Sequence, residues 1–98
     1  MTIPKTIKVG GTVYRICVTD QLYNHNECYG EMNLADQIIR IRPCGEDTMC
    51  VTLMHEILHA VNYFLGYTEH NEKQIDELAN AIYMVIKDNP KIFENNKK

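Results

Sequence analysis

The chain has 98 residues, a net charge of −3 and a hydrophobic share of 45%, which suffices for one compact domain with its own core. Residues 44–90 carry eight acidic side chains against two lysines, and such a surface repels phosphate backbones, so the sequence argues against nucleic-acid binding. No apolar stretch reaches the roughly 20 residues needed to span a bilayer, and the first residues lack the apolar segment of a signal peptide. We therefore expect a cytoplasmic protein with no membrane partner.

The first half of the chain alternates between apolar and polar residues, as strands do. A first hairpin is predicted over residues 6–18 with its turn at Gly10 and Gly11. A polar loop over residues 19–27 follows. A second hairpin is predicted over residues 28–42, with a turn at residues 35–36.

The second half has apolar residues at helical spacing. One helix is predicted over residues 47–65 and ends at Gly66. A second begins at a capping box formed by Asn71 and Gln74 and ends before Pro90. The fold class is therefore α+β, a small antiparallel sheet of two hairpins followed by two antiparallel helices. We expect one domain over residues 1–94 and a frayed tail over residues 95–98.

The first helix carries the pattern His-Glu-x-x-His at residues 55–59. Two imidazoles four residues apart project from one helix face and can bind one metal ion, most simply zinc. Glu56 points about 100° away from His55, so it is placed to act as general base on a metal-bound water. The apolar stripe of this helix lies roughly opposite His55 and His59, which keeps both histidines out of the main core.

A catalytic zinc site needs a third protein ligand. The longer His-Glu-x-x-His-x-x-Gly-x-x-His pattern is absent, because Asn62 and Leu65 occupy those positions, so the ligand is expected from the acidic start of the second helix. Helical periodicity favours Asp76, on the flank of the buried face. Three alternatives remain, and each acidic one has a competing explanation as a solvated residue that complements the helix dipole: Glu77, Glu72 and His70.

Cysteines and tyrosines add weaker candidates. The four cysteines form no Cys-x-x-Cys pair and are expected to be reduced: Cys17, Cys28, Cys44 and Cys50. Cys44 and Cys50 precede the histidine motif, but boundary packing is a simpler explanation for them than ligation. Three tyrosines are candidate donors to an oxyanion, although most tyrosines only pack at domain boundaries: Tyr29, Tyr63 and Tyr83.

The sequence resembles the short phage- and prophage-encoded zincin-like proteins related to the ImmA/IrrE metallopeptidases. The resemblance covers most of the chain, and its most specific parts are residues 52–60 and 78–83, Thr-Leu-Met-His-Glu-Ile-Leu-His-Ala and Leu-Ala-Asn-Ala-Ile-Tyr. It implies a gluzincin-like core in which His55 and His59 bind zinc and Glu56 is the base. Relatives carry a glutamate two residues before the Leu-Ala of the second helix, and here that position is Asp76, a shorter side chain.

These observations predict a zinc-dependent peptide-bond hydrolase with a narrow protein target, in the host cytoplasm if the protein is phage-encoded. The exposed edge of the hairpin that includes residues 37–42 could align an extended peptide by strand addition. The alternative is a non-catalytic zincin-fold module that sequesters a host or phage protein, because so small a domain offers limited walls for a substrate cleft. Another divalent metal could replace zinc in a site of two histidines and a carboxylate.

Overall fold

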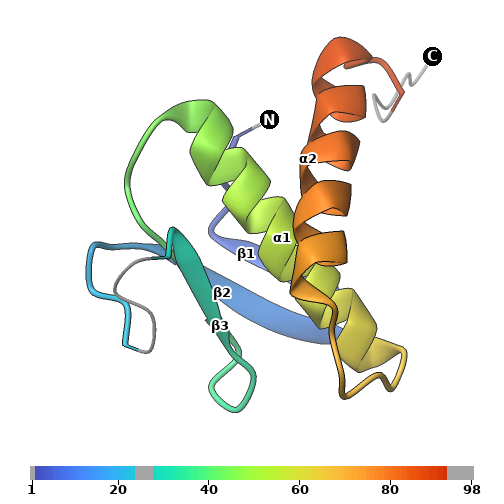
Figure 1. Ribbon diagram of the computed structural model, residues 1–98. Coiled ribbons are helices and arrows are strands. Elements are labelled where there is room, and N and C mark those ends of the chain that lie inside the picture. The colour runs from blue at the N-terminus through green and yellow to red at the C-terminus, as the bar shows by residue number, and fades with distance from the viewer. Residues whose placement is uncertain (1, 24–27, 93–98) are drawn as a thin grey trace, which may run out of the picture.

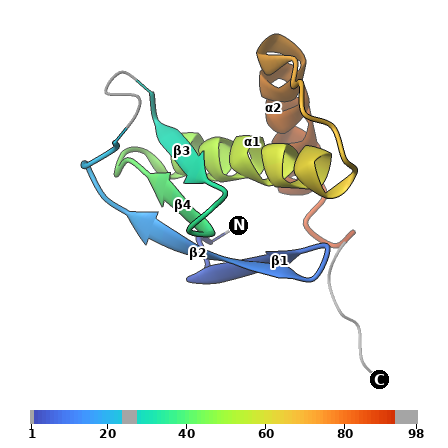
Figure 2. The same cartoon turned by 90° about the horizontal axis from the view of Figure 1, so that it is seen from below.

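The structure, a computed structural model, describes residues 2–23 and 28–92. Its four strands form one sheet in the order β1-β2-β4-β3 (Figures 1 and 2): β1 (Thr6–Val9), β2 (Thr12–Val18), β3 (Gly30–Asn33) and β4 (Ile38–Ile41). Both predicted hairpins are present, since β1 pairs antiparallel with β2 and β3 pairs antiparallel with β4. The first hairpin turns through Gly10 and Gly11, whose φ angles of 57° and 88° suit glycine.

The prediction of a wholly antiparallel sheet is wrong, because β2 and β4 run parallel, with Arg15 opposite Ile38. The residues of β4 and β3 agree with this strand order, in which β4 is a central strand and β3 an edge strand. Three of the four residues of β4 are buried isoleucines, so this strand needs cover from neighbours on both sides. β3 contains a glycine and an asparagine and lies at the edge of the sheet.

Two helices follow the sheet, α1 (Glu46–Phe64) and α2 (Glu72–Asp88). α1 packs against β1, β3 and β4, whereas among the described elements α2 packs on α1 alone. The molecule therefore has three layers, with α1 between the sheet and α2 (Figure 2). The chain reverses between the helices, and α2 crosses α1 at an inclined angle (Figure 1).

The end of α1 and the start of α2 follow local sequence signals. The side chain of Asn71 accepts a hydrogen bond from the Gln74 backbone N–H at 3.0 Å, which confirms the predicted N-cap of α2. After α1, Gly66 takes a φ of 91° and stops the helix. The predicted frayed tail, residues 95–98, lies outside the described residues.

The hydrophobic core lies between the sheet and α1. Its fully buried members come from three elements: Tyr14, Ile39, Ile41, Leu53 and Ala60. This packing fixes one face of α1 against β4 and leaves another face, which carries the histidines, turned toward β3 and α2. No helix in the described part of the chain is long and apolar enough to cross a membrane.

Candidate metal centre

His55 and His59 lie one turn apart on α1, with their rings tilted by 57° to each other. Their Nε2 atoms are 3.2 Å apart and the ring centroids 5.0 Å apart. Both side chains are half-buried, because the face of α1 that carries them looks toward the start of α2. The helical spacing of the motif thus brings two nitrogen donors to one point, as the sequence predicts.

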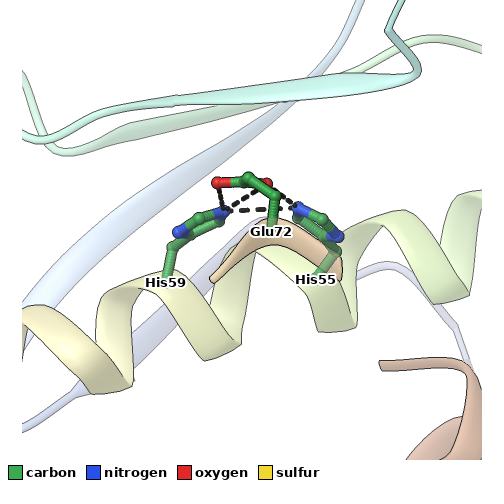
Figure 3. A group of neighbouring side chains, drawn as sticks. All are labelled: His55, His59 and Glu72. Carbon is green, nitrogen blue, oxygen red and sulfur yellow. Dashed lines mark hydrogen bonds and ion pairs between the residues drawn. The ribbon is translucent and has the colours of Figure 1, made fainter. Parts of the chain in front are cut away.

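Glu72, the first residue of α2, supplies a third donor at that point (Figure 3). Its Oε1 lies 3.2 Å from Nε2 of His55, and its Oε2 lies 3.0 Å from Nε2 of His59. A tetrahedral ion with bonds of about 2.0–2.1 Å separates neighbouring ligand atoms by about 3.3 Å. Donor type and spacing therefore both fit a zinc-sized cation.

The other candidates for third ligand lie farther from this point. Asp76 is one turn beyond Glu72 on α2, and its Oδ1 lies 3.6 Å from Nδ1 of His55, the ring nitrogen that faces away from the two converging Nε2 atoms. Glu77 is exposed and does not line the site. The geometry therefore favours Glu72, an alternative in the sequence analysis, over Asp76.

His70 lies behind His59, in the segment before α2. Its Nδ1 is 2.7 Å from Nδ1 of His59, and its Nε2 is 3.0 Å from the Tyr67 carbonyl oxygen. Its ring stacks at 4.9 Å on His59 and contacts Tyr63 at 4.5 Å. His70 thus contacts a candidate ligand on the side opposite Glu72.

Glu56 is buried in the same region, with 6% of its surface exposed. Burial raises the pKa of its carboxyl group to about 7, and the charges of Glu72 and Glu31 add to this effect. A carboxyl group with a pKa near neutrality can both accept and donate a proton at physiological pH. This is the property that a general base at a hydrolytic site requires.

The electrostatic setting of His59 also suits metal binding. Burial lowers its pKa, and the nearby His55 and His70 lower it further, against the opposing effect of Glu72. A lower pKa keeps the imidazole neutral, and only the neutral ring has a lone pair for a metal.

These side chains open into a cleft of about 900 Å³ between β3, α1 and the first turns of α2. Tyr29 and Tyr63 line it, so both stay candidate oxyanion donors.

Tyr83 donates a hydrogen bond of 2.6 Å to Asp47, which Lys87 also contacts at 2.8 Å. That hydrogen bond raises the pKa of Tyr83, and it fastens α2 to the start of α1.

None of the four cysteines, all of which lie among the described residues, is in a disulfide. Cys28 lines the cleft, while Cys44 and Cys50 do not. The donors that converge in the described part of the chain are nitrogen and oxygen atoms, so the structure gives no support to thiolate ligation.

The role of Gly30 was missed in the sequence analysis. A Cβ atom there would lie 2.5 Å from Thr52 Cγ2 and 3.7 Å from Glu56 Oε2, so the absence of a side chain lets β3 approach α1 closely beside Glu56. A glycine within a strand pattern signals such a close approach, and that signal was available in the sequence.

Replacing Gly30 by alanine is expected to lower the free energy of unfolding by about 1–3 kcal/mol, because the new methyl group overlaps Thr52. Urea denaturation measures this. Thr52→Ser removes the overlapping Cγ2 and retains the hydroxyl that donates to the Thr48 carbonyl at 2.7 Å. The double variant should therefore regain part of the lost stability, whereas strictly additive losses would contradict the proposed contact.

Comparison with known proteins gives no relative for this chain: no family model, no curated protein and no solved structure matches it. Kinship with the ImmA/IrrE metallopeptidases therefore stays a prediction from the motifs in the sequence.

Proposed function

We propose that the protein is a zinc-dependent peptide-bond hydrolase that acts on a narrow protein target. One observation carries the proposal: three candidate ligand atoms, the Nε2 atoms of His55 and His59 and Oε1 of Glu72, lie 3.2–3.3 Å from one another. A buried carboxyl group with a pKa near 7, that of Glu56, lies in the same cleft. A cation site beside a proton-accepting carboxylate is the arrangement that metal-assisted hydrolysis needs.

In this proposal His55, His59 and Glu72 hold the zinc ion. When bound, zinc lowers the pKa of a water molecule and polarises the carbonyl group of the scissile bond. Glu56 accepts the proton of the attacking water and returns it to the leaving amine. Tyr29 and Tyr63, which line the cleft, are the candidate donors to the oxygen of the carbonyl as its charge develops.

The edge strand β3 offers a place for an extended peptide. The Arg42 N–H donates to the Tyr29 carbonyl at 2.7 Å, so the hydrogen-bonded positions of this antiparallel ladder include residues 29, 31 and 33. Gly30 and Met32 then direct their backbone groups to the outer edge, next to the cleft. An extended peptide could therefore pair with β3 but not with β4, because β4 is enclosed between β2 and β3.

Metal content tests the site. We expect about one zinc ion per chain by inductively coupled plasma mass spectrometry, for protein purified without a histidine tag, and loss of that zinc in His59→Ala and Glu72→Ala. Asp76→Ala is the matched control on the same helix, and it should keep stoichiometric zinc with weaker affinity. Zinc retained in Glu72→Ala but lost in Asp76→Ala would reassign the third ligand. Absence of zinc from the wild type, even after incubation with it, would overturn the site.

A second candidate function uses the outer edge of β3 to bind a protein segment without catalysis. The outer edge of β3 is next to the cleft, so the protein could hold an extended segment of a host or phage protein by strand addition and not cleave it. In that case zinc would be structural or absent, and Glu56 would have no role in binding.

A further inference from the structure

We infer that the cleft selects peptides with a lysine or arginine close to the scissile bond, and that Asp76 is the residue that binds this cationic side chain. The inference deepens the proposed function and rests on its peptide site, the cleft beside β3. Its evidence is the charge of the residues that line the cleft and the place of Asp76 on α2.

The described residues that line the cleft include no lysine or arginine. Five of them carry a carboxyl group: Glu31, Asp47, Glu56, Glu72 and Asp76. Glu56 has only 6% of its surface exposed, and none of the described residues donates a hydrogen bond to its carboxyl group. A buried acceptor without a donor, in a cleft without lysine or arginine, favours a ligand that brings positive charge with it.

Two of the five carboxyl groups have a basic partner within the chain. Nη1 of Arg40 lies 3.4 Å from Oε2 of Glu31, and Nζ of Lys87 lies 2.8 Å from Oδ2 of Asp47. These two acids are therefore neutralised by the fold itself and contribute little to the attraction of a cationic peptide.

Asp76 is the carboxylate that stays without an opposite charge. In the proposed function the double charge of zinc balances its ligand Glu72 and the neighbouring Glu56. Asp76 has 64% of its side chain exposed, and its Oδ1 lies 3.6 Å from Nδ1 of His55, beyond the usual hydrogen-bond range. No described lysine or arginine forms an ion pair with it, so its carboxylate is available to a ligand.

The place of Asp76 also matches the spacing of an extended peptide. It follows Glu72 by four residues on α2, which is about 6 Å along the helix. In an extended peptide alternate side chains point to the same face, about 6.6 Å apart. A lysine or arginine one or two residues from the scissile bond can therefore reach Asp76 while the scissile carbonyl lies at the metal point.

Retention of peptides on immobilised, metal-free protein tests the charge preference without hydrolysis. Three pools of short unstructured peptides, with lysine, glutamine or glutamate at alternate positions, are passed over the protein and quantified by mass spectrometry. We expect the wild type to retain the lysine pool about 3–10-fold more than the glutamate pool, and Asp76→Asn to lower this ratio about threefold. Glu77→Gln is the matched control, because it removes the same charge from an exposed residue outside the cleft and should keep the wild-type ratio.

The same pools, incubated with zinc-loaded protein, report on hydrolysis. We expect the wild type to cleave the lysine pool faster than the glutamate pool, and Asp76→Asn to lose most of that preference. Equal retention of the two pools by the wild type, or equal ratios in Asp76→Asn and Glu77→Gln, would overturn the role of Asp76. Cleavage without a charge preference would overturn the specificity alone. A preference in retention that depends on Asp76, without any cleavage, would instead overturn the hydrolase and leave the specificity in place.

Discussion

Replacement of Glu56 by glutamine is expected to reduce peptide hydrolysis by about 10²–10⁴-fold while the protein still binds zinc. Glutamine has nearly the same size but cannot accept the proton of the attacking water. The metal should stay, because Glu56 is not among the atoms that converge between the two histidines and Glu72. The measurement is the appearance of new peptide termini, by mass spectrometry, in a mixture of unstructured peptides incubated with zinc-loaded protein.

Glu77→Gln is the matched control for this experiment. It makes the same chemical change on an exposed residue that does not line the cleft, so it should cleave at the wild-type rate. Equal cleavage by wild type and Glu56→Gln would contradict the role of Glu56 as base. Absence of cleavage by zinc-loaded wild type, together with unchanged peptide binding in Glu56→Gln, would favour the binding module.

Much of the fold follows from local signals in the sequence. The hairpin turn at Gly10 and Gly11, the Asn71 cap and the stop at Gly66 each depend on a few neighbouring residues, and the structure has all three. The convergence of His55 and His59 is equally local, because a helix fixes the geometry of residues four apart.

The choice of the third ligand depends on contacts between elements, which sequence patterns do not report. The crossing of α2 over α1 sets which residue of α2 lies opposite the two histidines, and sequence periodicity contains no information on that axial offset. Glu72 and Asp76 share one face of α2, so periodicity alone could not choose between them. The longer Glu72 side chain, at the start of the helix, reaches both Nε2 atoms.

The apolar pattern of α2 is also wider than the face that the helix buries. Ile75, Ala79 and Tyr83 are buried, whereas Leu78 and Val85 are 45% and 46% exposed. α2 contacts a single partner helix among the described elements, so only a narrow stripe is covered. The apolar pattern indicated a wide buried face because it cannot distinguish a helix that packs against one neighbour from a helix that packs against two.

In the metal-free protein, the free energy of unfolding is expected to fall by about 3 kcal/mol as the pH rises from about 4.5 to 7, as the contribution of Glu56 alone. Its carboxyl group is buried, and its pKa is raised from the ordinary 4.5 to about 7. Between these values the folded state keeps a proton that the unfolded state has lost, so stability decreases with rising pH. Each factor of ten in that proton affinity corresponds to about 1.4 kcal/mol.

Glu56→Gln isolates this contribution, because glutamine imitates the protonated carboxyl group at every pH. With a chelator present, the two proteins should be about equally stable below pH 4.5, and the variant should become more stable by about 3 kcal/mol above pH 7. Urea denaturation across this pH range measures the difference and cancels the titration of the other groups. Parallel pH curves for the two proteins would mean that Glu56 is not desolvated. A difference in the free energy of unfolding that grows as the pH rises would mean that the fold holds a destabilised carboxylate in the cleft. An ionisable group that is kept at a cost in stability is typical of a functional position.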